Sequence, residues 1–337
     1  MSADNFHEKF ASLKACVDAD LQHRMQSADW PAPLREAVAY SLLAGGKRLR
    51  PALVLIACEV CGGEPDSALP AAAGIEMIHT YSLIHDDLPS MDDDDLRRGR
   101  ATSHIVFGEA LAILAGDALL TFAFETLGTA STPSNVTADC LAVLSRAAGG
   151  VGMVGGQILD LAAEGALYRG RTASGEAEFA SFRRSQGAHS AVGDGESSGE
   201  SDNPTSDDGS IRVEQLIQIH RMKTGALITA ALELGASVAG SNPQQRQALV
   251  EYGQCIGLAF QIADDLLDVT GSHEKLGKET GRDDELGKLT YPSLIGIESS
   301  RRKAEALVQT ACSALDVFGT RADVLRQLAR FIVERDH

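Results

Sequence analysis

The chain has 337 residues and a formal net charge of −17, with 47 acidic against 30 basic side chains. This acidic balance argues against nucleic acid as a partner, because a nucleic-acid-binding surface needs a strongly basic face. Hydrophobic residues make up 44% of the chain but aromatic residues only 5%. The long apolar runs are rich in Ala and Leu, which favours packed helices over strands. We therefore expect a mostly α-helical protein.

Two features bear on where the protein works. No apolar run reaches about 18 to 20 residues without a polar interruption, and the first ten residues lack the basic and then apolar order of a signal peptide. The six cysteines are scattered, which is typical of a reducing compartment. Cys58 and Cys61 form a lone CxxC pair without a second pair or a nearby His, so we interpret them as core packing. We expect a cytoplasmic protein without stable membrane association.

Helical patterns recur along the chain, separated by Gly, Pro and Ser signals. The predicted helices span residues 6–27, 32–43, 50–61, 68–87, 104–127, 134–163, 211–239 and 243–269, and broken helices follow from residue 291 to the C-terminus. Val-, Ile- and Thr-rich alternating segments of strand length are hard to find.

Residues 165–210 differ from the rest of the chain. They are rich in Gly, Ser, Asp and Glu, and they contain few aliphatic residues. Such a segment cannot bury enough apolar surface to offset the entropy cost of ordering it. We predict a mobile insertion and favour a passive loop over a lid or a partner site.

Two aspartate clusters lie far apart in the sequence, each at the end of an apolar, helix-like run. The first, HDDLPSMDDDDLRRGR, contains Asp86 and Asp92, which are six residues apart and out of phase on an ideal helix. Pro89 should end the helix and allow the chain to bring Asp92 back toward Asp86. Taken alone, residues 92–95 are equally typical of a solvated acidic loop.

The second cluster, QIADDLLDV, has a helical arrangement. Residues three and four apart share a helical face, so four side chains can point into one space: Gln261, Asp264, Asp265 and Asp268. Unpaired carboxylates in this apolar stretch would be costly to desolvate without cations. Carboxylate oxygens suit Mg²⁺, which usually binds one or two carboxylates together with substrate phosphates. Facing clusters would therefore hold divalent metal and a phosphate ester.

Basic residues accompany the acidic clusters. In GGKRLRP, Lys47 and Arg50 follow Gly45 and Gly46, which permit a close approach of an anion. Singly, each basic candidate has a structural explanation, but together they describe a site for two anionic substrates, one bound through metal and one through Lys and Arg alone. The other candidates are His79, Arg97, Arg98, Lys278, Lys288, and Lys223 with Thr224 before Gly225, where the helix can kink.

A GxGxxG pattern at residues 150–155 matches the dinucleotide-binding fingerprint. It follows an Ala-rich helix and not a strand, and no βαβ unit surrounds it. We interpret these glycines as sites where helices approach closely.

The chain closely resembles the trans-type isoprenyl diphosphate synthases, particularly the bacterial farnesyl diphosphate synthases. The resemblance is carried, in order, by GGKRLRP, IEMIHTYSLIHDDLPSMDDDDLRRGRATSH, GGQILDL, HRMKTGAL, GLAFQIADDLLDV and LGKETGRDDELGKLTYP. It covers nearly the whole chain except the insertion. It implies one polyprenyl synthetase domain over residues 1–337, a homodimer, and the isoprenoid synthase type I fold, an all-α bundle of antiparallel and orthogonal helices around a deep central cavity.

The resemblance also implies Mg²⁺-dependent head-to-tail condensation of isopentenyl diphosphate with dimethylallyl and then geranyl diphosphate. Three Mg²⁺ ions would hold the allylic diphosphate, two on Asp86 and Asp92 and the third on Asp264. The resemblance implies that the allylic diphosphate is also bound by Arg97, Lys223 and Lys278. It implies that isopentenyl diphosphate binds without metal, at Gly46, Lys47, Arg50, His79 and Arg98. Oxygens of Thr224, Gln261 and the Lys223 backbone would stabilise the allylic cation.

The family likeness also bears on product length. In the family, the positions five and four before the first Asp, here Tyr81 and Ser82, line the cavity floor. A Tyr there would block extension, so we predict farnesyl diphosphate, although Tyr81 packing merely in the core is an alternative.

Geranyl or geranylgeranyl diphosphate would be another endpoint of the same chemistry. A non-catalytic regulatory subunit would usually lose an Asp cluster or its basic partners, and a terpene cyclase would not need Lys47, Arg50 and His79.

Overall fold

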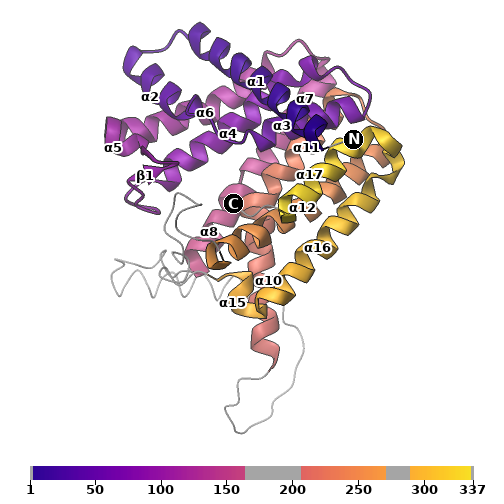
Figure 1. Cartoon of the computed structure of the whole chain (residues 1–337). Helices are drawn as coiled ribbons and strands as arrows, with labels where there is room; N and C mark the ends of the chain where they lie inside the picture. The colour runs from indigo at the N-terminus through magenta and orange to yellow at the C-terminus, as the bar shows by residue number, and fades with distance from the viewer. Residues whose placement is uncertain (1–2, 164–205, 271–288, 335–337) are drawn as a thin grey trace, which may run out of the picture.

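The computed structural model describes residues 3–163, 206–270 and 289–334, and within these ranges the chain is mostly helical, as predicted (Figure 1). Lys278, Lys288 and most of the predicted insertion lie outside the described residues, whereas residues 206–210 belong to a helix. The elements up to residue 163 are α1 (Ala3–Ser27), α2 (Ala32–Leu42), α3 (Leu49–Val60), the 3-10 helix η1 (Pro65–Ala68), α4 (Leu69–Asp86), β1 (Leu96–Arg97), β2 (Arg100–Ala101), α5 (Ser103–Phe107), α6 (Glu109–Gly128), α7 (Ser134–Ala148) and α8 (Met153–Ala163).

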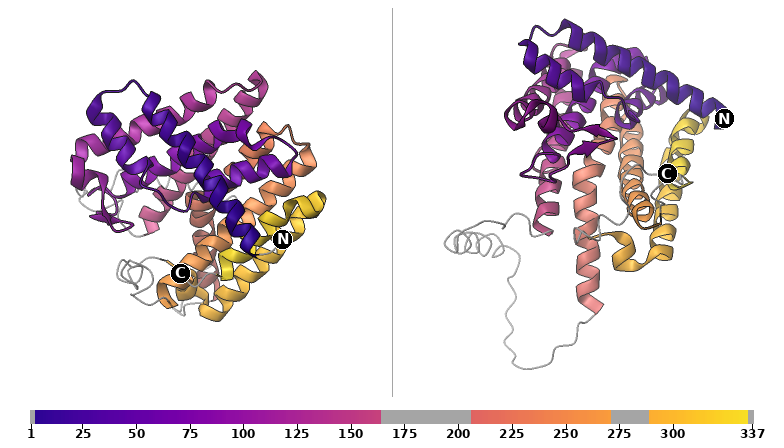
Figure 2. Two further views of the ribbon diagram at one scale, coloured as in Figure 1. Left: turned by 45° about the horizontal axis from the view of Figure 1, so that its top comes forward. Right: turned by 60° about the vertical axis from the view of Figure 1, so that its left-hand side comes forward.

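The remaining elements are helical. They are α10 (Ser206–His220), the π-helical segment η3 (Arg221–Gly225), α11 (Ala226–Val238), α12 (Pro243–Thr270), α15 (Tyr291–Ile295), α16 (Ile297–Ala314), the 3-10 segment η4 (Leu315–Ala322) and α17 (Asp323–Glu334). In Figures 1 and 2, the first turns of α10 extend beyond the helices around it, and α16 and α17 lie along one side of the bundle.

Two predicted helices are interrupted. The helix expected over residues 104–127 is two helices, because Gly108 has a positive φ of 82° and ends α5. The helix expected over residues 134–163 is likewise α7 and α8, separated by a turn at residues 149–152. The two-residue strands β1 and β2 are antiparallel, and they are too short to produce an alternating pattern in the sequence.

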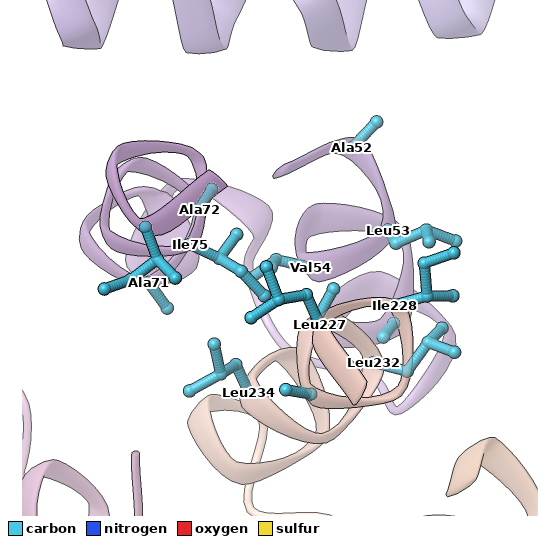
Figure 3. Packing of buried hydrophobic residues seen from close by; sticks show 14 of the residues in the cluster. Ala52, Leu53, Val54, Ala71, Ala72, Ile75, Leu227, Ile228, Leu232 and Leu234 are labelled. Carbon is cyan, nitrogen blue, oxygen red and sulfur yellow. The ribbon is translucent and has the colours of Figure 1, made fainter. Parts of the chain in front are cut away.

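The core forms where α11 packs against α3 and α4. Figure 3 shows buried side chains from all three helices: Leu53 and Val54 of α3, Ile75 of α4, and Leu227 and Leu232 of α11. Helix α4 also packs closely against α6, and α12 packs closely against both α16 and α11. Cys58 is buried and Cys61 half-buried near the end of α3, which agrees with the packing interpretation of the CxxC pair.

A buried ion pair joins the first four helices. Arg48, before α3, donates to Glu76 Oε1 of α4 at 2.7 Å, and both side chains are almost fully buried. The same guanidinium donates to Asp18 Oδ1 of α1 at 2.8 Å and to the carbonyl of Leu42 in α2 at 2.8 Å. Removing one partner from such a pair leaves the other charge buried without a partner. Arg48 of GGKRLRP is therefore a structural residue between two candidate binding residues.

Among the described helices, α6 is long and apolar enough to cross a membrane by length and composition, and 39% of its most apolar window is buried. One face of α6 packs along α4. Ile113 and Leu114 remain 43% and 56% exposed on the same helix. Packing within one chain therefore leaves part of the apolar surface of α6 exposed.

Helix α11 approaches α3 most closely at Gly235, where a Cβ would collide with the carbonyl oxygen of Val54. We expect Gly235→Ala to lower the free energy of unfolding by about 1–3 kcal/mol, because the two helices must move apart. Gly128, at the end of α6, has open space around it and is the matched control. Urea unfolding followed by circular dichroism should show a midpoint for Gly128→Ala equal to or slightly above that of the parent, because Ala favours a helix more than Gly does. Equal stability of Gly235→Ala would contradict the close packing of α3 on α11.

Candidate active site

A cavity of about 540 Å³ lies between α4, α6, α8 and the π-helical segment η3. Its polar lining includes Arg50, His79, Asp86, Lys223 and Thr224, and Tyr81 and Ser82 form part of the same wall. The rest of the lining is mostly apolar and includes Met153, Ile158 and Leu161. Residues that the sequence assigned to both diphosphate sites and to the cavity floor therefore lie around one space.

The first acidic cluster folds back on itself as predicted. Helix α4 ends at Asp86, and the backbone N–H of Asp92 donates to the Asp86 carbonyl at 2.9 Å. Asp87 points elsewhere and binds Arg97, whose Nη2 is 2.6 Å from Asp87 Oδ1. Arg97 is therefore held by a carboxylate at the edge of the cluster.

The Asp86 carboxyl is only partly compensated by nearby cations. Its pKa is raised to about 6, mainly by burial; Lys223 and Arg97 oppose the rise, and the carboxylates of Asp92 and Asp87 contribute to it. A bound cation would favour the ionised form of such a carboxyl. This donor chemistry fits a hard divalent ion.

Lys223 connects the first cluster to α8. Its Nζ lies 2.6 Å from Asp160 Oδ2, and its charge also acts on Asp86 and Asp92. A Cβ at Gly156 would collide with the Lys223 backbone nitrogen, so this glycine allows α8 to approach η3. The π-helical turn places the kink where the sequence predicted one, before Gly225.

Packing also explains the GxGxxG pattern. A Cβ at Gly152 would collide with the Ala147 carbonyl oxygen, and one at Gly155 would collide with that of Gly150. These contacts lie within the turn between α7 and α8, whereas the close approach of helical segments is seen at Gly155 and Gly156, which lie against Met222 and Lys223 of η3.

The second acidic cluster has two roles. Gln261 accepts from the Thr224 hydroxyl at 3.1 Å and donates to Asp265 Oδ1 at 3.2 Å. Asp265 is buried, and its other oxygen accepts from the backbone N–H of Tyr291 at the start of α15. Asp265 is thus used by the fold, whereas the charge of Asp264 acts on Arg50 of the cavity wall.

The structure does not form a complete metal cage from protein groups. Across residues 3–163, 206–270 and 289–334, no three His, Cys, Asp or Glu side chains converge on one point. The carboxylates of Asp86, Asp92 and Asp264 are therefore partial ligand sets. They fit Mg²⁺, which binds few carboxylates and completes its shell with water and phosphate oxygens.

The basic residues gather around His79. Burial lowers the His79 pKa well below 6.5, and the charges of Arg50, Arg98, Arg97 and Arg48 lower it further. The Nε of Arg50 is buried without a hydrogen-bond partner among the described atoms. A buried donor beside a neutral His and several guanidiniums is suited to an anion that carries several acceptor oxygens.

Gly46 makes room for Arg98, and its assignment to the isopentenyl diphosphate site stays a prediction. A Cβ at Gly46 would collide with the Arg98 guanidinium, which donates to the Gly45 carbonyl at 2.8 Å. Gly46 also has a φ of 126°, which L side chains rarely adopt. Lys47 is exposed.

Sequence reasoning did not single out several residues of this site. Asp160 lies within GGQILDL, and the Gly-Gly before it signalled the close approach of another segment to its helix. Asp87 lies among other acidic residues, so the sequence pattern does not distinguish it from them. His85 lines the cavity, and its ring lies in the space left by Gly116 of α6, a contact between distant residues that no local pattern shows.

The sequence model of the polyprenyl synthetase family matches residues 31–316. The chain belongs to this family. It is 43% identical over 310 residues to geranylgeranyl pyrophosphate synthase 7 of Arabidopsis thaliana, covering 91% of this chain and 78% of that protein. It is 38% identical over 327 residues to a farnesyl diphosphate synthase of Geobacillus stearothermophilus, covering 96% of each.

Solved structures agree with this assignment. The crystal structure of an FPP/GFPP synthase from Zymomonas mobilis matches with a TM-score of 0.76 at 35% identity, covering 98% of this chain and 100% of that one. This polyprenyl synthetase therefore has the isoprenoid synthase fold that the sequence predicted. It is a trans-prenyltransferase that elongates prenyl diphosphates.

The environment of His79 predicts a pH dependence of stability. Because its folded pKa lies well below 6.5, the unfolded chain binds a proton that the folded chain does not. Stability should therefore fall as the pH drops below about 6.5, by up to about 1.4 kcal/mol per pH unit. His79→Gln keeps a hydrogen-bond donor and removes the titration.

Chemical denaturation between about pH 8 and pH 5 measures this difference. The free energy of unfolding of the parent should decline relative to that of His79→Gln on the acid side. Parallel pH profiles for the two proteins would show that His79 is not held neutral by burial and the arginines.

Proposed function

We propose that this trans-prenyltransferase condenses isopentenyl diphosphate with dimethylallyl and then geranyl diphosphate and releases farnesyl diphosphate. The observation that carries the proposal is the position of Tyr81 in the cavity wall. Tyr81 precedes Asp86 by five residues, about 7.5 Å along the helix axis, and its ring is 6% exposed. A chain growing from a diphosphate at Asp86 and Lys223 along α4 would meet this ring.

Contacts around Tyr81 support a firm floor. Its ring meets the edge of the His85 ring, with centroids 5.8 Å apart and planes at 77°. The Nε2 of His85 lies 3.1 Å from the Ile113 carbonyl oxygen of α6. His85 thus links the Tyr81 ring of α4 to the backbone of α6.

The charges divide the reaction between two halves of the site. Lys223 and Arg97 lie with the acidic cluster, where the leaving diphosphate develops charge, and stabilising that charge lowers the barrier to ionisation. Arg50, Arg98 and the neutral His79 offer donors for isopentenyl diphosphate without metal.

Oxygen dipoles would stabilise the allylic cation. The linked Thr224 and Gln261 side chains provide them, and released diphosphate is the base for proton loss. The largely apolar lining of the cavity excludes water that would capture the cation.

Mg²⁺ is the proposed cofactor, with three ions expected together with the substrate. Asp86, Asp92 and Asp264 would hold these ions. When bound, the ions neutralise diphosphate charge that Lys and Arg side chains alone would leave partly exposed. Lys278, which the family likeness assigns to the same diphosphate, lies outside the described residues.

A homodimer is the proposed assembly. Helix α6 leaves Ile113 and Leu114 exposed, and the neighbouring α5 leaves Ile105 and Val106 52% and 46% exposed. Exposed apolar side chains on neighbouring helices favour a protein interface. A second copy of the chain, presenting the same face, would cover it.

The endpoint is the main alternative. The relatives named above include both a geranylgeranyl and a farnesyl synthase, so overall similarity does not decide the product length, and we base the fifteen-carbon product on Tyr81. A regulatory subunit is less consistent with the site, because both acidic clusters and their basic partners are retained.

Purified protein with Mg²⁺, isopentenyl diphosphate and either dimethylallyl or geranyl diphosphate should yield a fifteen-carbon diphosphate, identified by mass spectrometry. Tyr81→Ala should shift the main product to twenty carbons or longer, because the floor is removed. Tyr81→Phe retains the ring and should keep the fifteen-carbon product.

Two results would contradict this proposal in different ways. A ten- or twenty-carbon product from the parent, or an unchanged product from Tyr81→Ala, would remove Tyr81 from the floor but leave the chemistry intact. No product from either allylic substrate would instead favour the regulatory-subunit alternative.

A further inference from the structure

The hairpin of β1 and β2 carries three arginines beside the anion site. Arg97 and Arg100 face each other in the ladder, and Arg98 lies in the tight turn between them. Arg97 is paired with Asp87, and Arg98 donates to the Gly45 carbonyl. The position of this hairpin therefore sets where the guanidiniums lie relative to His79.

The hairpin has little internal stabilisation. Each strand has two residues, and an isolated two-stranded hairpin is marginal even when it is longer. Arg98 has a φ of 53°, a left-handed conformation that is unfavourable for a residue with a Cβ. Such a turn persists only when surrounding structure holds it.

Tyr40 of α2 supplies that support through three contacts. Its hydroxyl donates to the Ala101 carbonyl of β2 at 2.8 Å. The Arg100 guanidinium carbon lies 4.4 Å from the centre of its ring. The ring of Phe107 in α5 packs edge-on against it, with centroids 5.3 Å apart. Tyr40 thus binds the strand that follows the Arg98 turn.

Tyr40 lies outside the large cavity that Asp86 and Lys223 line. It lines a smaller adjoining cavity, of about 90 Å³, together with His79, Arg97 and Arg98. Its phenol is already engaged by Ala101. The side chain therefore contacts the hairpin that carries the binding residues.

We propose that Tyr40 is a positioning residue that holds the hairpin so that Arg98 lies over Gly46 beside His79, and that it thereby sets the affinity for isopentenyl diphosphate. Arg97 depends less on Tyr40, because its ion pair with Asp87 fixes it separately to the end of α4. The affinity for the allylic diphosphate should consequently change little. This inference rests on the function proposed above.

The test compares Tyr40→Phe with Tyr252→Phe. Both variants lose one phenol–carbonyl hydrogen bond, since the Tyr252 hydroxyl donates to the Leu325 carbonyl at 2.7 Å in a buried part of the C-terminal helices. Tyr40→Phe should raise the KM for isopentenyl diphosphate about 3- to 10-fold, the factor that corresponds to one hydrogen bond. The allylic KM and the kcat at saturation should stay within about 2-fold. Tyr252→Phe should lower the melting temperature without changing either KM.

Arg100→Gln is a second test of the hairpin position. Because Arg100 is exposed, this substitution should not disturb the fold. It removes the cation from the Tyr40 ring and should also raise the isopentenyl KM selectively. Unchanged KM values in Tyr40→Phe and Arg100→Gln would overturn the positioning role. Equal rises in the KM for the two substrates would overturn it as well. An inactive parent protein would instead overturn the proposed function, so the two failures are distinguishable.

Discussion

The structure depends on holding opposite charges around one largely apolar cavity. Arg50 and His79 line this cavity, with the pKa of His79 lowered well below 6.5, and Asp86 in the same lining has a pKa raised to about 6, mainly by burial. Neither set of charges is fully compensated by the other, and burying an unpaired charge is costly. In the proposed reaction, bound diphosphate and metal would offset this cost.

The surrounding fold uses separate devices to keep these charges in place. The Arg48–Glu76 ion pair joins α1–α4 below the basic residues. Gly156 brings α8 against the π-helical turn, which lets Asp160 hold Lys223. Asp265 fixes the start of α15 and, through Gln261, orients Thr224. Arg48 and Asp265 each adjoin a proposed binding residue in sequence, Lys47 and Asp264, so these two motifs contain more polar residues than the proposed chemistry needs.

Much of this arrangement could be predicted from the sequence because local rules govern it. Proline chemistry predicted the return of Asp92 toward Asp86, and the family likeness named Thr224 and Gln261, although not the hydrogen bond between them. What could not be predicted depends on distant contacts: the hydrogen bond of Asp265 to Tyr291, the room that Gly46 makes for Arg98, and the contact of His85 with α6. The breaks at residues 108 and 149–152 were missed because their flanking sequences remain helical in pattern. The cytoplasmic location stays a prediction.

The central claim is that one diphosphate is held by cationic side chains alone and the other through metal. Titration calorimetry of isopentenyl diphosphate and of an unreactive thiolo analogue of dimethylallyl diphosphate, each with Mg²⁺ and with a chelator, tests it directly. We predict that isopentenyl diphosphate binds equally well in both conditions and that the allylic analogue binds only with Mg²⁺. A requirement for Mg²⁺ by both ligands, or by neither, would contradict the division of the site into two differently charged halves.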